Sequence, residues 1–134
     1  MILDSSAVVA ILRAEPEASV MAELMSLAPA CAISAVSYVE AAIVIDSSRD
    51  PIASRRFDDF FRESQIIVEP VTYRQARLAR EAYRDFGKGR HRAGLNLGDC
   101  FAYALAKEKG EALLFKGDDF NYTDVEEAQG SPEP

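Results

Sequence analysis

The stretch that decides the fold is the opening MILDSSAVVAILR, residues 1–13. Three apolar residues followed by Asp4 are typical of a short buried strand, and Ser5 and Ser6 are favourable N-cap residues for a helix over residues 7–13. The same order, a short apolar strand and then a helix, recurs along the chain. This alternation predicts an α/β fold with a mostly parallel sheet that helices cover on both faces.

The other expected elements continue this pattern, and no repeat or long linker divides them. We therefore predict one domain over residues 1–127 and a flexible tail over residues 128–134. Phe57, Phe60 and Phe61 share one helix face and are expected in the core rather than in a dimer interface. Further helices are expected over residues 15–27, 36–45, 74–86 and 99–109 and from residue 51 onward, and further strands over residues 31–34, 66–71 and 112–115.

Composition narrows the class of protein. A chain of 134 residues that is 49% hydrophobic can bury the core of one globular domain. No apolar run approaches the roughly 20 residues that cross a bilayer, and no basic leader precedes the first strand, so we expect a cytoplasmic protein without a membrane partner. Cys31 and Cys100 lie in apolar segments and are expected to be core thiols rather than a disulfide or zinc ligands.

Acidic residues follow the predicted strands, at the end of a parallel sheet where binding and catalytic sites usually lie. Asp4 follows the first strand, Asp118 and Asp119 follow the last strand, and Asp99 opens the helix before that strand. Sites in such folds lie beyond the carboxyl ends of the strands, so these acids can converge at one edge. Taken singly, each could instead be a helix-capping or loop residue.

Glu40 is the acid that is hardest to explain as a surface residue. It is the only charged residue between Ile33 and Ile45, and its helical neighbours are Val36, Ile43 and Val44. A carboxylate on such a face is buried or lines a cleft, although a surface position on a two-sided helix is the alternative.

A group of buried carboxylates calls for a cation. Two carboxylates about 4 Å apart repel by roughly 4 kcal/mol at an effective dielectric of 20, and a divalent ion reverses the sign of that energy. Oxygen ligands alone favour Mg²⁺ or Mn²⁺ over zinc. We therefore predict hydrolysis of a phosphodiester by metal-activated water, with Asp4, Glu40 and Asp99 as catalytic residues. Ser6 could hydrogen-bond an acid or simply cap a helix, and Asn96 could cap the helix at Asp99 or orient a phosphate.

The charge distribution indicates where a polyanion would bind. The net charge is −7, yet residues 74–92 hold seven Lys/Arg and two acids, a local balance of +5, whereas the remaining 8 basic and 20 acidic residues give −12. One basic strip on an acidic body suits a polyanion held at a defined place, and a solvated helix face is the alternative. The expected contacts with the polyanion are Lys88, Arg90, His91, Arg92 and Lys116, with an exposed bystander as the alternative for His91.

Four segments together resemble one family. They are MILDSSA at residues 1–7, SYVEA at 37–41, GKGRHRAGLNLGDCFAYA at 87–104 and LLFKGDDF at 113–120. This order resembles that of PIN-domain ribonucleases, specifically the VapC toxins of type II toxin–antitoxin systems. The resemblance implies a three-layer α/β/α sandwich, Mg²⁺- or Mn²⁺-dependent endoribonuclease activity, homodimers and a cognate antitoxin whose tail occupies the acidic groove. The implied metal ligands are Asp4, Glu40, Asp99 and one of Asp118 and Asp119, with Asp119 favoured.

Three other functions remain open from the sequence. A phospho-accepting receiver domain would have adjacent acids after the first strand; here Ser5 follows Asp4, although Lys116 is suitably placed. A phosphohydrolase with an Asp nucleophile would have a second acid where Ser6 stands. A catalytically silent interaction module would bind no Mn²⁺.

Overall fold

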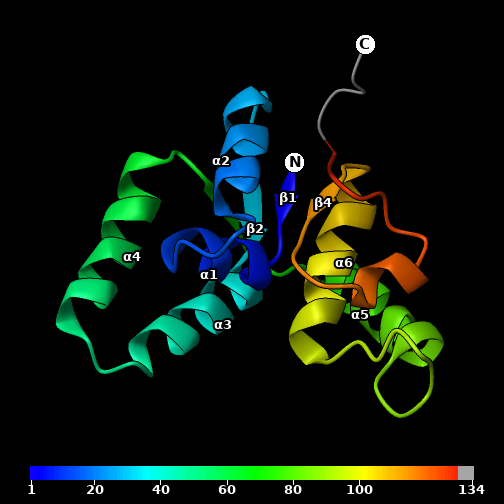
Figure 1. Ribbon diagram of the computed structural model, residues 1–134. Helices are drawn as coiled ribbons and strands as arrows, with labels where there is room; N and C mark the ends of the chain where they lie inside the picture. The colour runs from blue at the N-terminus through cyan, green and yellow to red at the C-terminus, as the bar shows by residue number, and fades with distance from the viewer. Residues whose placement is uncertain (130–134) are drawn as a thin grey trace.

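A computed structural model describes residues 1–129 and shows the predicted parallel sheet (Figure 1). Its four strands lie in the order β3-β2-β1-β4, and every neighbouring pair is parallel. Ile2 pairs with Ala32 on one side and with Leu113 on the other, so β1 lies at the centre. The strands are β1 (Ile2–Leu3), β2 (Ala32–Ser34), β3 (Ile67–Glu69) and β4 (Leu113–Leu114).

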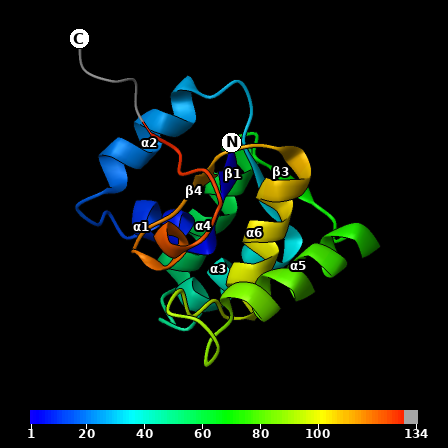
Figure 2. The ribbon, with the colours of Figure 1, turned by 90° about the vertical axis from the view of Figure 1, so that its right-hand side faces the viewer.

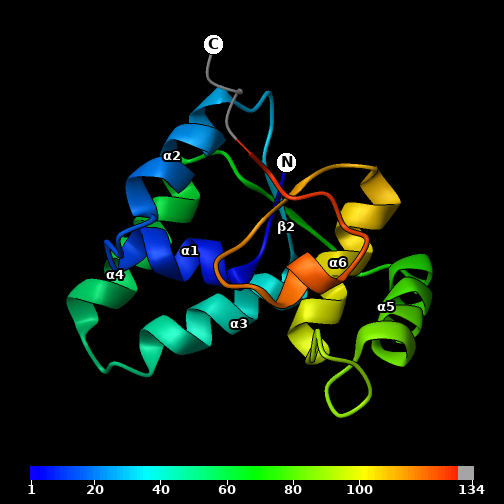
Figure 3. The same ribbon diagram turned by 45° about the vertical axis from the view of Figure 1, so that its right-hand side comes forward.

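Helices cover both faces of the sheet, as the alternating pattern predicts. The helices between residues 5 and 63 lie on one face, and those between residues 73 and 109 lie on the other (Figures 1 and 3). Figure 2 looks onto the second face, where α6 lies against β1, β2 and β4 and α5 packs against α6. The helices are α1 (Ser5–Leu12), α2 (Ala18–Leu27), α3 (Ala35–Asp46), α4 (Pro51–Glu63), α5 (Tyr73–Phe86) and α6 (Leu97–Lys109). None of the helices within residues 1–129 has the length and apolar character of a membrane span.

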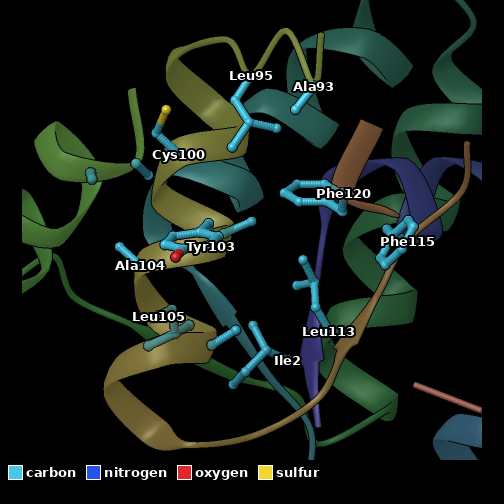
Figure 4. Packing of buried hydrophobic residues seen from close by; sticks show 14 of the residues in the cluster. Ile2, Ala93, Leu95, Cys100, Tyr103, Ala104, Leu105, Leu113, Phe115 and Phe120 are labelled. Atoms are coloured by element: carbon cyan, nitrogen blue, oxygen red, sulfur yellow. The ribbon is translucent and has the colours of Figure 1, made fainter. Parts of the chain in front are cut away.

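The sheet divides the core into two clusters. Under α6, Ile2 and Leu113 from the strands pack against Leu105 and Tyr103 (Figure 4). On the other face, Leu3 and Ile33 pack with α1, α3 and α4.

The second cluster contains the phenylalanines of α4. Phe57 and Phe61 pack against the Tyr38 ring at centroid distances of 5.3 and 4.8 Å. The expectation that they serve the core is confirmed.

Several helix starts differ from the sequence expectation; α2 begins at Ala18 rather than at residue 15, and α3 and α5 each begin one residue early. Asp4 itself, rather than Ser5 or Ser6, caps α1, because its side chain accepts a hydrogen bond from the Ser6 amide. Asn96 caps α6, so that helix begins at Leu97 instead of Asp99. A 3₁₀ helix η1 (Asp119–Tyr122) also follows β4, where the sequence predicts only a loop.

The ordered chain extends beyond the predicted domain boundary at residue 127. The Leu113 amide donates to the Glu126 carbonyl at 2.8 Å, and the Ala128 amide donates to the Leu113 carbonyl at 2.9 Å. Backbone hydrogen bonds therefore hold the chain along β4 as far as Ala128. The rest of the predicted tail, residues 130–134, lies outside the described residues.

The opposite edge of the sheet is formed by β3, whose outer side pairs with no other strand of residues 1–129. Ile67 and Val68 on this strand are 52% and 41% exposed. The two edges therefore differ: the C-terminal segment covers β4, and β3 remains open.

Candidate active site

The candidate site lies at the carboxyl edge of the sheet, where β1 ends between β2 and β4. Asp4 follows β1 directly, Glu40 lies on the helix that follows β2, and Asp119 begins η1 after β4. Figure 3 shows α3 passing from the α1 side toward the first turn of α6, which carries Asp99. The topology thus gathers acids from four separate segments at one edge, as parallel α/β sheets do.

Asp4 is a buried carboxylate with one unsatisfied oxygen. It is 2% exposed, and its Oδ2 accepts hydrogen bonds from the Ser6 amide at 3.0 Å and from the Ser6 hydroxyl at 2.5 Å. Its Oδ1 is buried and has no hydrogen-bond partner among the described residues. Burial raises the pKa of Asp4, the Ser6 hydrogen bonds oppose this, and the charge of Glu40 raises it further. A buried acceptor left unpaired is costly, so this oxygen is suited to meeting a cation.

Glu40 lies in a space that only a glycine leaves open. Its Oε1 accepts a hydrogen bond from the Ser5 hydroxyl at 2.6 Å. A Cβ added to Gly98 would lie 2.1 Å from Oε2 and 2.5 Å from Cδ of Glu40. The carboxylate is thus held between the start of α1 and the first turn of α6.

Asp99 has two roles at the start of α6. Its carboxylate accepts a hydrogen bond from the Asn96 amide at 3.0 Å, and the Asn96 side chain accepts one from the Asp99 amide at 2.9 Å. Burial raises the pKa of Asp99 to about 7 against the effect of the Asn96 amide, and the charges of Asp4, Glu40 and Asp119 raise it further. Asp4, Glu40 and Asp119 are therefore close enough to Asp99 to interact with it electrostatically.

Asp118 and Asp119 differ in their surroundings although both are exposed. Asp118 precedes η1 and accepts a long hydrogen bond of 3.5 Å from the Asn121 side-chain amide. Asp119, not Asp118, is among the charges that raise the pKa of Asp99. This supports Asp119 as the fourth acid of the site.

The donor set fits a hard cation with an open coordination sphere. All the converging side chains offer oxygen, which suits Mg²⁺ or Mn²⁺. Within residues 1–129 no three aspartate, glutamate, histidine or cysteine side chains lie close enough together to hold one metal ion between them. Mg²⁺ commonly keeps several waters and uses only one or two protein carboxylates, so an open arrangement around Asp4 is compatible with it.

Ser6 connects two strand ends at the site. Its hydroxyl donates to Asp4 and accepts a hydrogen bond from the Lys116 amide at 3.0 Å, which ties β4 to the start of α1. The Lys116 ammonium points elsewhere, since it pairs with Glu15 at 2.9 Å and Glu17 at 3.5 Å. In this arrangement the ammonium pairs with these two acids rather than with the acids of the candidate site, so it lacks the placement that a receiver domain would need.

The basic loop between α5 and α6 is internally hydrogen-bonded. Lys88, Arg90 and Arg92 are exposed, and no ion pair of the described residues includes them. His91 instead serves the loop: its Nδ1 accepts from the Ala93 amide at 3.0 Å, and its ring packs edge-on against Phe86 at 5.3 Å. Only Nε2 of His91 therefore remains for a contact with RNA.

Sequence reasoning missed Ser5 and Gly98 as parts of the site. Ser5 was expected only as a possible helix cap, and nothing in the sequence signals its hydrogen bond across to α3. Gly98 lies within the segment that carries the family resemblance, but its purpose becomes visible only when the position of Glu40 is known.

Comparisons with known proteins cover nearly the whole chain. The family model described as PIN domain matches residues 1–126. Ribonuclease VapC28 of Mycobacterium tuberculosis is 54% identical over 129 residues, covering 96% of this chain and 97% of its own length. Ribonuclease VapC of Mycolicibacterium smegmatis is 48% identical over 125 residues, covering 93% and 97%.

Solved structures share the fold at low sequence identity. Mycobacterium tuberculosis VapC20, described as a sarcin-ricin loop cleaving toxin, superimposes with a TM-score of 0.77 at 17% identity, covering 96% of this chain and 98% of its own. FitAcB from Neisseria gonorrhoeae superimposes with a TM-score of 0.67 at 19% identity, covering 96% of each. The chain therefore belongs to the PIN-domain family and, within it, to the VapC ribonucleases.

Proposed function

We propose that this VapC ribonuclease cleaves RNA phosphodiesters with Mg²⁺ or Mn²⁺ held by Asp4, Glu40, Asp99 and Asp119. The observation that carries the proposal is the buried Oδ1 of Asp4, which has no hydrogen-bond partner in the described residues and belongs to a carboxylate that interacts electrostatically with Glu40 and Asp99. A divalent cation would satisfy this oxygen and offset the mutual repulsion of the carboxylates.

In this proposal the acidic residues would bind the metal, and their hydrogen-bonding neighbours would orient them. Asp4 is fixed by two hydrogen bonds from Ser6, and Glu40 is fixed by the Ser5 hydroxyl, so neither carboxylate needs to reorganise. The hydrogen bond from the Asn96 amide orients the carboxylate of Asp99. The bound metal would supply Lewis-acid chemistry, activating water for attack and stabilising charge that develops on the phosphate.

The exposed side chains of Lys88, Arg90 and Arg92 would hold phosphates that flank the cleaved bond. They are free of ion pairs within residues 1–129, and their loop leads directly into α6 and Asp99. Phosphate contacts of this kind give affinity without reading sequence, and they weaken as salt rises.

RNA cleavage with and without metal tests the proposal. Total and transfer RNA would be incubated with the protein in Mg²⁺, Mn²⁺ or EDTA, and the new ends mapped. We expect cleavage only with metal, and a loss of more than about 100-fold in Asp99→Asn and Asp4→Asn, since even residues that merely support metal ligands are worth 10–100-fold. Asp58→Asn on the exposed face of α4 is the matched control and should cleave normally. Undiminished cleavage in EDTA, or by the Asp4→Asn, Asp99→Asn double variant, would contradict the metal mechanism.

An antitoxin that occupies the acidic groove is the partner that fits this function. A toxin–antitoxin complex from Klebsiella pneumoniae shares the fold with a TM-score of 0.68 at 16% identity, which supports looking for such a partner. We expect expression of the wild-type chain to arrest growth and Asp99→Asn to leave growth normal. Material purified from the native host should carry a small protein whose removal restores RNA cleavage.

A homodimer through α3 and the start of α6 is also part of the proposal. Val39, Ile43 and Leu97 are 51%, 63% and 73% exposed and line a shallow groove of about 570 Å³ in which Glu40 is the charged residue. Apolar patches of this kind are usually covered in solution. Light scattering should report a dimer for the wild type and a monomer for Ile43→Glu, whereas Ile52→Glu, at an equally exposed position of α4, should stay dimeric.

A further inference from the structure

Tyr122 lies on the same side of η1 as the candidate ligand Asp119. The two are three residues apart in a 3₁₀ helix, where side chains at i and i+3 eclipse each other. Phe120 points the other way, into the core, where it is 4% exposed and packs against Phe115 at 5.1 Å. The buried Phe120 fixes η1, so an aromatic ring that is 43% exposed stands directly beside the fourth acid.

Arg92 lies over the Tyr122 ring. Its guanidinium carbon is 4.6 Å from the ring centroid, and no acidic side chain among residues 1–129 forms an ion pair with it. The loop that carries Arg92 is fixed by its own hydrogen bonds. The Lys88 amide donates to the Leu95 carbonyl at 2.9 Å, and the Arg90 and His91 amides donate to the Gly87 carbonyl at 3.0 Å. This hydrogen-bonded loop therefore positions Arg92 over the Tyr122 ring.

We infer that Tyr122 and Arg92 form a nucleobase-stacking subsite that holds one single-stranded RNA nucleotide next to the cleaved phosphate. The inference rests on the proposed RNA cleavage. Aromatic rings and arginine planes are the side chains on which unpaired RNA bases stack. The guanidinium remains able to contact a phosphate because it has no carboxylate partner.

The subsite has a clear structural alternative, in which the pair only clasps the loop to η1. A clasp would act equally on RNA with and without bases, so a base-free probe separates it from a subsite. The chain also offers a control for a non-specific aromatic effect. Arg77 lies over the Tyr73 ring at 5.9 Å, and Tyr73 is 81% exposed, but this pair stands at the start of α5, away from the acids. A non-specific aromatic effect would act at either pair, whereas a subsite would act only at Tyr122.

Equilibrium binding without cleavage tests the inference. The parent is the Asp99→Asn protein in Mg²⁺, and the probes are fluorescein-labelled adenosine oligoribonucleotides of about 12 nucleotides, within the range that single-strand binding sites span. The second probe has the same sugar–phosphate backbone without bases. Fluorescence anisotropy gives the Kd of each probe for the parent, Tyr122→Ala, Tyr122→Phe and Tyr73→Ala, and thermal melting checks that each variant is folded. Tyr122→Leu replaces Tyr122→Ala if the latter does not fold.

The subsite predicts a base-dependent loss. Tyr122→Ala should weaken binding of the adenosine probe by about 5- to 150-fold, the worth of one stacked base, and leave the base-free probe nearly unchanged. Tyr122→Phe and Tyr73→Ala should match the parent on both probes. An equal loss on both probes, or no loss on either, would overturn the subsite and leave the clasp.

The outcome is separable from that of the proposed function. If the wild type cleaves RNA with Mg²⁺ while Tyr122→Ala binds both probes like the parent, only the subsite falls. If the wild type cleaves no RNA under any metal condition, the proposed function falls whatever the binding data show.

Discussion

Gly98 shapes the site because it has no Cβ atom. The carboxylate of Glu40 occupies the place where a Cβ would stand, at 2.1 Å from Oε2. Alanine at this position would force Glu40 away from Ser5 and from the other acids. Because alanine is a better helix former than glycine by roughly 1 kcal/mol, the change need not destabilise α6 itself.

We predict that Gly98→Ala loses about 10- to 100-fold in metal affinity and RNA cleavage while the protein stays folded, since the ligand is misplaced and not removed. Calorimetric titration with Mn²⁺ and a melting curve measure the two properties separately. Leu97→Ala, one residue earlier and 73% exposed, is the control for alanine in this turn. Adding Glu40→Asp to Gly98→Ala shortens the acid and should recover part of the affinity; a Gly98→Ala protein that binds Mn²⁺ normally would refute the steric account.

Asp99 makes the stability of the metal-free protein depend on pH. Its pKa of about 7 lies above its ordinary value of 3.8, chiefly because it is buried. Below pH 3.8 both the folded and the unfolded chain hold the proton of Asp99. Between pH 3.8 and about 7 the folded chain retains a proton that the unfolded chain has lost. Stability should therefore fall as pH rises from about 4 to about 7 and level off above that. We expect a loss of about 1–2 kcal/mol, because solvent partly screens this carboxyl.

Urea unfolding in EDTA across this pH range checks the expectation, with Asp99→Asn expected to show a flatter profile. Metal should reverse the trend, since Mg²⁺ or Mn²⁺ competes with the proton and binds more tightly above pH 7. A wild-type profile that rises with pH in EDTA would be inconsistent with a buried, charge-crowded Asp99.

At the scale of elements, the first turn of α6 combines helix capping with the site. The side chain of Asn96 caps the helix and its amide orients the carboxylate of Asp99. We predict that Asn96→Ala destabilises the protein by about 0.5–2 kcal/mol, the usual cost of a lost N-cap, and also weakens cleavage because Asp99 is less well fixed. Asn96→Ser should retain most of both properties, and urea unfolding together with RNA cleavage measures them. An Asn96→Ala protein as stable as the wild type would show that the cap contributes little.

The elements themselves could largely be predicted from the sequence, because short apolar strands and helices with clear start and stop residues alternate. Gly110 ends α6 in a left-handed conformation with φ 63°, as a glycine after a helix predicts. The errors arise where one side chain serves two purposes. Asp4 is both a candidate ligand and the cap of α1, so the serines after it belong to the first turn of the helix and are not its caps. Nothing local predicts η1, whose position depends on Phe120 reaching the distant core.

The site could be predicted as a set of acids but not as a geometry. The convergence of Asp4, Glu40 and Asp99 follows from the rule for parallel sheets, and it is the fold that brings them together. The pairing of Lys116 with Glu15 and Glu17 could not be predicted, because those acids stand about a hundred residues away in the chain. The same is true of Ser5 and Gly98, whose roles require the position of α3.

At the scale of the whole molecule, the site links the first strand to the last. Its acids come from segments that only the complete fold assembles, so metal binding should stabilise the native state as a whole. At a metal concentration of 100 times Kd the gain is about 2.7 kcal/mol, which for a domain of this size corresponds to a rise in Tm of roughly 8–10 °C.

Thermal melting with increasing Mn²⁺ measures this gain. Asp4→Asn should melt no lower than the wild type in EDTA, because a repelling charge is removed, and should gain little from Mn²⁺. Asp58→Asn should respond like the wild type. Equal stabilisation of Asp4→Asn and the wild type by Mn²⁺ would place the metal elsewhere.

The open side of β3 has a practical consequence for handling the protein. A strand with free backbone groups and exposed Ile67 and Val68 is a template on which another chain can add itself, so concentrated solutions should tend to aggregate. A lysine is the usual natural protection of such an edge. Ile67→Lys should therefore raise the concentration at which the protein precipitates and leave RNA cleavage unchanged, which turbidity and activity measurements on the same samples would show.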